Sequence, residues 1–126
     1  MEKKIIKTTN APDPIGPYNQ AVLLDNLLFI SGQVAINPAN GNVENSDIIE
    51  ETNLVMQNLK AILSEAGMDF SNTVKTTIFL SDMSLFASVN EVYSKYFTTD
   101  FPSRETVAVK GLPKNVNVEI SMIAGR

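Results

Sequence analysis

The first part of the chain carries short apolar runs that are typical of β-strands. Residues 4–8 are predicted to form a first strand. Two further apolar runs, 22–24 and 27–30, flank the adjacent residues Asp25 and Asn26. Because two such runs separated by a polar pair are typical of a β-hairpin, we expect the second and third strands to pair there.

The stretch 47–66 has the periodicity of an amphipathic helix. Asp47 is a candidate N-cap, with Glu50 three residues later, and Gly67 provides the stop. Side chains that recur at helical spacing along one side are Ile49, Thr52, Met56, Leu59, Leu63 and Ala66. A helix is therefore predicted over residues 47–66.

The rest of the chain alternates between strand and helix signals. Residues 74–80 alternate and are rich in β-branched side chains, whereas 84–97 has helical spacing. The apolar side of this second helix comprises Phe86, Val89, Tyr93, Tyr96 and Phe97. Residues 105–110 and 116–124 are predicted to form the last two strands. This order predicts a single α+β domain, with one mixed sheet and two helices on one face.

The other face of that sheet also needs cover. Alternation along the last two strands leaves apolar side chains on both sides: Val107 and Val109 lie opposite Ala108, and Ile120 and Met122 lie opposite Ile123. Since one layer of helices covers one face only, we predict that association with other copies of the chain buries the second face.

Length and composition suit one globular domain that spans residues 1–126. Of the 126 residues, 44% are hydrophobic and 19% charged, a balance that argues against disorder. No apolar run approaches the roughly 20 residues needed to span a bilayer, and the polar start of the chain lacks the apolar core of an export signal. Cysteine is absent as well. We therefore expect a cytoplasmic protein without a membrane partner.

Histidine is absent, and this absence constrains the chemistry most. It removes the usual general base near neutral pH and the commonest ligand of transition metals. Acid–base catalysis must then use Asp, Glu, Lys, Tyr or bound water. The formal net charge of −4 and the pI of about 4.7 lack the basic excess of duplex-binding proteins. Nucleic acid is therefore not expected as a partner.

Arg104 is the single internal arginine, since the other one, Arg126, ends the chain. It stands at the mouth of a predicted strand. The planar fork of arginine binds a carboxylate through two parallel hydrogen bonds, so Arg104 is a candidate anchor for an anionic substrate. The alternative is a surface salt bridge, which is the commoner fate of an arginine on position alone.

Glu119 and Asn90 occupy places where a polar side chain needs a partner. Glu119 lies within the last predicted strand, where it either orients and deprotonates a water molecule or belongs to a solvated face. Asn90 falls at helical spacing with Phe86 and Tyr93. A buried amide there must be hydrogen-bonded, either to a ligand or to nearby backbone.

Tyr18, Ser31 and Gly32 are further candidates for a binding site. Tyr18 follows the stiff pair Gly16 and Pro17. This pair could hold the Tyr18 ring over a cleft, and the alternative is that the ring only packs against other side chains. Ser31 and Gly32 end a predicted strand, where a hydroxyl and a bare backbone approach a ligand or form a turn or bulge. The residues alone thus indicate a soluble, oligomeric α+β domain with an anion-binding site, and they lead no further.

Taken in order, these residues resemble the signatures of the RidA family, also called YjgF/YER057c/UK114. The similarity runs through nearly the whole chain in three blocks. The opening block comprises residues 15–18, 20–21, 30–33, 37–38 and Gly41. The middle block comprises residues 74–80, 82–83, Phe86, 89–90, Tyr93 and 96–97. The closing block comprises residues 101–104, Val107, Val109, 112–113, 118–120 and Ala124. All three blocks in order make a specific match.

The resemblance implies a chorismate-mutase-like fold and a homotrimer whose sheets close a central barrel. It implies active sites between neighbouring subunits. The implied activity is hydrolysis of reactive 2-imino acids and their enamine tautomers, such as 2-iminobutanoate and 2-iminopropanoate, to 2-keto acids and ammonia. The resemblance also implies that this deaminase uses no metal and no cofactor.

Roles for individual residues follow from the same resemblance. Arg104 would bind the substrate carboxylate, and Glu119 would position and activate the hydrolytic water. The residues that would line the cleft are Tyr18, Ser31 and Asn90, with Gly32 letting the backbone come close. Thr106 departs from the family pattern, because many members carry a cysteine there. This departure rules out a thiol contribution and leaves open that the backbone near Thr106 contacts the substrate, so Thr106 stays among the candidate substrate-binding residues.

Two other functions stand beside the imine hydrolase. The first is a non-catalytic module that binds a small carboxylic acid in the same clefts, with a regulatory or chaperone-like role. The second is an endoribonuclease or translation inhibitor, as proposed for some relatives, which the missing histidine and the acidic charge disfavour. Only the imine hydrolase needs Glu119 and a water molecule beside the imine carbon.

Overall fold

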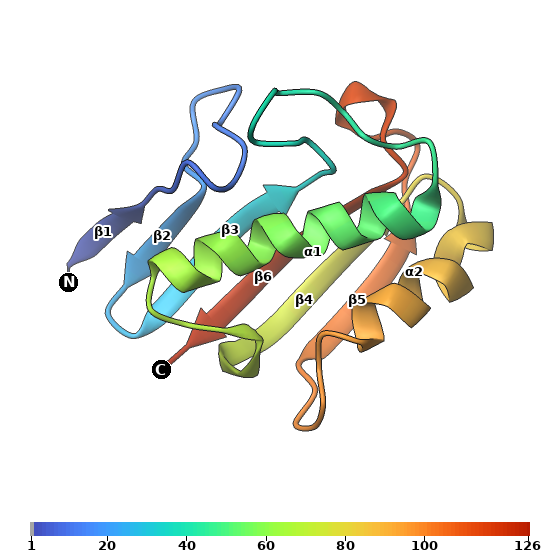
Figure 1. The fold of residues 1–126 in the computed structure, drawn as a ribbon. Coiled ribbons are helices and arrows are strands. Elements are labelled where there is room, and N and C mark those ends of the chain that lie inside the picture. Colours follow the sequence, from blue (N-terminus) through green and yellow to red (C-terminus); the bar gives the residue numbers. More distant parts are fainter. Residues whose placement is uncertain (1) are drawn as a thin grey trace.

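The computed structural model describes residues 2–126 and contains one six-stranded sheet and two α-helices (Figure 1). The strands are β1 Lys3–Ile6, β2 Ala21–Leu24, β3 Leu27–Gln33, β4 Thr73–Leu80, β5 Ser103–Ala108 and β6 Val118–Gly125. The helices are α1 Ile48–Glu65 and α2 Phe86–Ser94, and short 3-10 turns are formed by Phe70–Asn72, Met83–Leu85 and Pro113–Asn115.

The sheet is mixed, with the strand order β1-β2-β3-β6-β4-β5. β2 and β3 form the predicted hairpin, in which Leu24 pairs with Leu27 across the Asp25–Asn26 turn. β6 lies between β3 and β4 and is antiparallel to both, so α1 crosses over between two parallel strands. α2 makes a second crossover, from β4 to its parallel neighbour β5.

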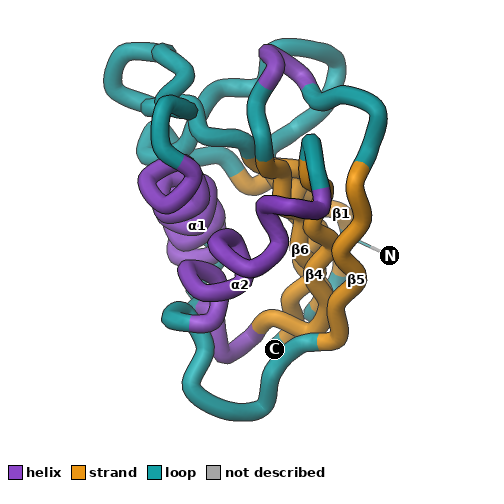
Figure 2. Tube along the Cα trace, turned by 90° about the vertical axis from the view of Figure 1, so that its right-hand side faces the viewer, coloured by secondary structure: helices purple, strands orange, loops and turns teal. Residues whose placement is uncertain are grey.

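Both helices lie on one side of the sheet, as Figure 2 shows, and within residues 2–126 no helix covers the other side. The core fills the space between these two layers. Met56, Leu59 and Leu63 of α1 and Ile78 and Leu80 of β4 are almost fully buried there. The predicted α+β domain with two helices on a single face is confirmed.

α1 begins and ends where its capping residues predict. The Asp47 carboxylate accepts hydrogen bonds from the N–H groups of Ile49 at 2.8 Å and Glu50 at 3.3 Å, and Gly67 has a left-handed φ of 74° beyond the last turn. The expected burial of Ile49 is wrong. The buried stripe begins at Ile48 instead, and Ile49 lies about 100° away from it around the helix. Within residues 2–126, neither α1 nor another helix is long and apolar enough to cross a bilayer.

α2 is shorter at both ends than the helix predicted over 84–97. Its start is displaced because Asp82 accepts a hydrogen bond from Ser84 N at 2.8 Å and begins a 3-10 turn first. Tyr96 and Phe97 follow the helix, yet both rings still pack on the core. The apolar spacing identified residues that pack together but not the point at which the helix ends.

Strand boundaries also differ from the predicted ones. β5 begins at Ser103 rather than 105, so Arg104 lies inside the strand and not at its mouth. β6 begins at Val118 rather than 116, because Lys114 and Asn115 adopt left-handed φ values of 56° and 55° in the preceding turn. β1 covers Lys3–Ile6 instead of 4–8.

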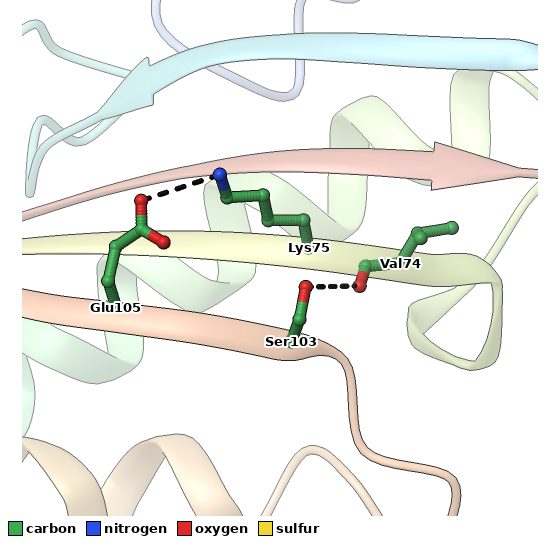
Figure 3. Close-up of polar contacts among 4 residues, drawn as sticks. All are labelled: Val74, Lys75, Ser103 and Glu105. Atoms are coloured by element: carbon green, nitrogen blue, oxygen red, sulfur yellow. Dashed lines mark hydrogen bonds and ion pairs between the residues drawn. The ribbon is translucent and has the colours of Figure 1, made fainter.

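The face of the sheet opposite the helices combines apolar and polar side chains, and we call it the open face. Phe29 and Val107 are exposed there, and Ile123 is partly exposed. Figure 3 shows Lys75 of β4 reaching toward Glu105 of β5, with 3.4 Å between the ammonium nitrogen and the carboxylate oxygen. Nothing within residues 2–126 forms a second layer over this face. The oligomer that would cover it stays a prediction.

Candidate active site

Gln20 holds the loop that leads to Tyr18. Its side chain is buried, and its amide nitrogen lies 3.0, 3.2 and 2.9 Å from the carbonyl oxygens of Thr8, Ala11 and Pro12. Its own carbonyl oxygen accepts a hydrogen bond from Thr8 N at 2.8 Å. Because a buried amide with all its polar atoms paired is strongly restrained, the loop keeps a fixed path beside the sheet.

Ser31 and Gly32 lie in the last part of β3, where the register with β6 shifts. The bulge considered as one interpretation of this pair is therefore present. Ser31 Oγ donates a hydrogen bond to the carbonyl oxygen of Asn19 at 2.6 Å, which ties the bulge to the loop after Tyr18. Tyr18 itself is exposed, and its hydroxyl accepts a hydrogen bond from Ile15 N at 3.4 Å.

Glu119 projects from β6 and packs against the bare Cα of Gly32. A Cβ added to Gly32 would lie 2.8 Å from Cδ and 3.0 Å from Cγ of Glu119. The carboxyl is half-buried, and this desolvation raises the pKa of Glu119 above its ordinary value of 4.5. Glu119 is therefore not a fully solvated side chain, and a carboxylate with a raised pKa suits a general base.

Tyr18, Ser31, Gly32 and Glu119 line one cleft of about 360 Å³, which we call the glutamate cleft. The apolar part of its lining comes from Pro12, Pro14, Ile15, Val34, Ile36 and Pro113. Lys114 also lines the cleft, with the left-handed φ of 56° that a residue with a side chain adopts only at a cost in free energy. The cleft thus combines two acids, Asp13 and Glu119, with one lysine and two hydroxyl groups within mainly apolar walls.

Arg104 lies apart from this cleft, in contact with α2. One of its terminal nitrogens donates a hydrogen bond to Asn90 Oδ1 at 2.7 Å. Its guanidinium carbon lies 5.1 Å from the ring centroid of Tyr93 and 5.7 Å from that of Phe86, within the range of cation–π attraction. These three partners share one side of α2 because they are spaced by four and three residues. We call Arg104, Asn90, Tyr93 and Phe86 the arginine cradle.

The guanidinium of Arg104 keeps donors free for an anion. Within residues 2–126, the one ion pair shorter than 4.0 Å joins Lys75 and Glu105, so Arg104 does not form the surface salt bridge considered above. Asn90 accepts one of the five N–H donors that a guanidinium offers. An open space of about 420 Å³ adjoins the cradle, lined by Asn90, Tyr93, Ser94, Phe101, Pro102 and Arg104.

Two hydroxyl groups are relevant to the cradle, one within it on Tyr93 and one beside it on Thr106. The hydroxyl of Tyr93 shares a 2.9 Å hydrogen bond with Thr76 Oγ1, and burial raises the pKa of Tyr93, so its hydroxyl stays neutral. Thr106 Oγ1, two residues beyond Arg104 on the same strand, is buried without a hydrogen-bond partner among the described residues. A buried hydroxyl without a partner costs free energy, so a ligand that reaches Thr106 would relieve this cost.

The glutamate cleft and the arginine cradle belong to opposite faces of the sheet. Arg104 pairs with Thr76, which is fully buried under the helices. Val118 and Ile120 are also fully buried on that side, so Glu119 between them points to the other face. One chain therefore does not bring Arg104 and Glu119 together.

The glutamate cleft and the arginine cradle, which we call the two half-sites, contain three residues that the sequence does not identify as functional. The periodicity places Tyr93 in the core alone, although its spacing of three residues from Asn90 puts both on one side of a helix. Gln20 had no distinguishing local pattern, because its partners lie about ten residues upstream. Lys114 enters the cleft through a backbone conformation that its residue type does not predict.

The fold and the two half-sites together define a small α+β protein. It presents Glu119 in a cleft on one face of its sheet and Arg104 in a cradle on the other face. The profile of the family described as Endoribonuclease L-PSP matches residues 8–125. A RutC family protein from Pyrococcus abyssi is 47% identical over 124 residues, which are 98% of each protein. The chain therefore belongs to this family, the RidA/YjgF family whose signatures its sequence resembles.

Two further relatives carry names that bear on chemistry. The 2-iminobutanoate/2-iminopropanoate deaminase of Homo sapiens is 43% identical over 122 residues, covering 97% of this chain and 89% of that protein. The crystal structure of E. coli TdcF with bound serine has a TM-score of 0.94 at 40% identity, covering 98% of each chain. These names describe the relatives: one is a deaminase, and the other binds a small amino acid.

Proposed function

We propose that this protein is a 2-iminobutanoate/2-iminopropanoate deaminase, which hydrolyses reactive 2-imino acids to 2-keto acids and ammonia. The active protein is a homotrimer that associates through the open face, and each active site lies between two subunits. The deaminase name of a relative with 43% identity supports this reaction. No metal or cofactor takes part in the proposed mechanism.

One observation carries the proposal: an acid and a cation that suit this chemistry lie on opposite faces of the same sheet. Arg104 has free donors and no acidic partner among the described residues. Glu119 lies in a cleft, and its pKa is raised by burial. Neither half-site completes a reaction alone. A neighbouring subunit that brings its arginine cradle to the mouth of the glutamate cleft would complete the site, and the apolar side chains exposed on the open face, such as Phe29 and Val107, support such an association.

The cradle would bind the carboxylate of the substrate. The guanidinium fork of Arg104 donates two parallel hydrogen bonds to such a group, and Asn90 and the two rings hold the fork in place. Thr106, with its unpaired hydroxyl nearby, adds a further donor to the substrate. Anchoring the carboxylate turns the attack of water into a step between oriented groups.

Glu119 would act as the general base toward a water molecule in the cleft. The water oxygen forms a bond to the electrophilic carbon of the protonated imine, and the π electrons of the carbon–nitrogen bond move to nitrogen. The Glu119 carboxylate accepts the proton that the water loses. The product of this step is a neutral amine on a tetrahedral carbon that also carries a hydroxyl group.

Collapse of the tetrahedral intermediate releases ammonia. The protonated Glu119 returns its proton to the amine nitrogen, and the carbon–nitrogen bond breaks as its electron pair leaves with ammonia. The hydroxyl then passes its proton to solvent water and becomes the carbonyl of a 2-keto acid. Glu119 can perform both steps because its raised pKa lies closer to neutrality than that of a solvated glutamate. The side chains of Tyr18 and Ser31 line the cleft in which the reacting carbon would sit.

The proposal is tested by ammonia release from 2-aminoacrylate generated in situ. We expect the wild type to accelerate release above the buffer rate, and Arg104→Ala and Glu119→Ala to lose most of this acceleration. Glu91→Ala is the matched control, because Glu91 is an exposed acid on α2 next to Asn90 but outside both half-sites. A wild type with no rate above buffer would show the protein to be a carboxylate-binding module instead.

A further inference from the structure

Glu51 is a buried acid that neither half-site contains. It lies in α1 with 0% of its surface exposed, on the helix side of the sheet. Its Oε2 accepts hydrogen bonds from Asn117 N at 2.7 Å and Val118 N at 3.2 Å, and its Oε1 accepts one from Asn117 Nδ2 at 2.9 Å. A helix that begins near residue 48 thereby holds the backbone at which β6 begins.

The segment held by Glu51 connects two parts of the glutamate cleft. Glu119 follows Val118 directly, and the Pro113–Asn115 turn, whose Lys114 lines the cleft, ends two residues before Asn117. On its other side, Asn117 accepts hydrogen bonds from Ser81: its carbonyl from Ser81 N at 2.9 Å and its Oδ1 from Ser81 Oγ at 3.0 Å. Asn117 is therefore held between β4 and α1.

The chemistry of this contact requires an acceptor at position 51. Three N–H donors converge on Glu51, and a carboxylate provides acceptors without adding a donor. Within residues 2–126 no cation lies within 4.0 Å of it, so hydrogen bonds alone compensate the burial of the carboxylate. Removing the acceptor would leave the N–H groups of Asn117 and Val118 buried without partners, and the start of β6 would shift to satisfy them.

We propose that Glu51 is a positioning residue, which places Glu119 in the glutamate cleft by fixing the backbone at Asn117 and Val118. Glu51 touches no substrate, because it lies on the opposite side of the sheet from the Glu119 carboxyl. This inference deepens the proposed function and rests on it for its effect on catalysis. Its structural part, the placement of Glu119 by Glu51, stands independently of the reaction.

The first measurement follows the titration of the Glu119 carboxyl by ¹³C NMR. The signal is assigned by its loss in Glu119→Gln. In the wild type the pKa lies above 4.5 because the carboxyl is half-buried. The other titratable groups that line the cleft are Asp13, Tyr18 and Lys114. None of these groups is substituted in the position-51 variants, so a change in the Glu119 pKa reports a change in the hydration of Glu119 or in its position relative to these groups.

Three substitutions at position 51 separate the acceptor from the packing. Glu51→Met keeps the length of the side chain but replaces the carboxylate with a weak acceptor. Glu51→Asp keeps the charge but shortens the reach, and Glu51→Gln keeps one strong acceptor for the two backbone N–H groups. The matched control is Thr52→Val, because Thr52 is equally buried on α1 and its hydroxyl bonds only within the helix, to Ile48 O at 2.7 Å.

We expect Glu51→Met to lower the Glu119 pKa toward 4.5 and to reduce kcat for 2-aminoacrylate on the order of tenfold, with KM changed by about twofold or less. Glu51→Asp should shift both in the same direction by less, and it decides the outcome if Glu51→Met does not fold. Glu51→Gln should restore kcat to within about threefold of wild type. Thr52→Val should leave the pKa and kcat at their wild-type values.

The possible failures are distinguishable. If the wild type is active but Glu51→Met changes neither the Glu119 titration nor kcat, the role of Glu51 is overturned and the proposed function stands. If Glu51→Met does not fold, the same result in Glu51→Asp overturns the role of Glu51. Equal losses in Thr52→Val would also overturn it, because general destabilisation would then explain them. An inactive wild type would overturn the proposed function, and the NMR titration would still decide whether Glu51 positions Glu119.

Discussion

Replacing Gly32 by alanine tests how closely the structure places Glu119. The added Cβ would lie 2.8 Å from Glu119 Cδ and 3.0 Å from Cγ, whereas ordinary contacts begin at 3.4 Å. The Glu119 side chain must therefore move away from β3 by about 0.6 Å or more. Its own backbone in β6 is held by pairing with β4 on one side and β3 on the other, so the displacement falls on the carboxyl.

The expected loss follows from the size of this displacement. A misplacement of about 1 Å at a reacting group costs on the order of 100-fold in rate. We therefore expect kcat for imine hydrolysis to fall about 10- to 100-fold, which corresponds to about 1.4 to 2.7 kcal/mol in activation free energy. KM should change little, because in the proposed mechanism Arg104 binds the substrate carboxylate in the arginine cradle.

Steady-state ammonia release from 2-aminoacrylate provides the assay, with thermal unfolding measured in parallel. Gly111→Ala is the control, since a Cβ there meets no atom within 4 Å, and it should retain the wild-type kcat. The reasoning is refuted if Gly32→Ala turns over at the wild-type rate. It is equally refuted if KM alone rises, because Gly32 would then border the substrate rather than support Glu119.

Four further outcomes are expected. Arg104→Lys should raise KM about tenfold while changing kcat less, because lysine keeps the charge but lacks the planar fork and its stacking on the rings; equal KM values would contradict the cradle. In wild type, kcat should fall as the pH drops through the raised pKa of Glu119, at a pH above the ordinary value of 4.5. A raised pKa contributes stability that is present at low pH and lost as the pH rises through it, so Glu119→Gln should gain more in Tm over wild type at about pH 7 than at about pH 4; a larger gain at low pH would show that the pKa is lowered instead. Phe29→Glu should dissociate the predicted oligomer, which light scattering would detect as a lower mass. Ile49→Glu is the control, because Ile49 is exposed to the same extent (39% against 40% for Phe29) but lies on α1, and it should leave the mass unchanged.

The layer architecture could be predicted from the sequence because it depends on periodicity. Alternation in the strands and the helical stripe of α1 are properties of neighbouring residues, and they gave two helices on one side of a sheet with an apolar second face. Boundaries were less predictable where a local polar contact competes with the period. Asp82 begins a 3-10 turn ahead of α2, and Lys114 delays β6 with its left-handed conformation.

Candidate residues could be named from the sequence, but their division between two faces of the sheet could not be predicted. Arg104 and Glu119 stand out as candidates because a lone internal arginine and a glutamate between apolar neighbours are visible in the chain, whereas their roles and the lining residues were indicated by the family resemblance. Their placement on opposite faces depends on which side of β5 and β6 each side chain occupies. The contact between Glu119 and Gly32 likewise depends on strand order, since β3 and β6 are adjacent only in the folded sheet.

Mixing two inactive variants tests the central claim, that Arg104 and Glu119 of one active site come from different subunits. Arg104→Ala and Glu119→Gln chains are unfolded together in equal amounts, refolded, and assayed for ammonia release beside each variant refolded alone. In randomly mixed trimers, about a quarter of the sites between subunits would pair an intact arginine with an intact glutamate, so about a quarter of the wild-type rate should return. If mass spectrometry shows mixed oligomers but no activity returns, the two residues act within one chain or not at all, and the account is wrong.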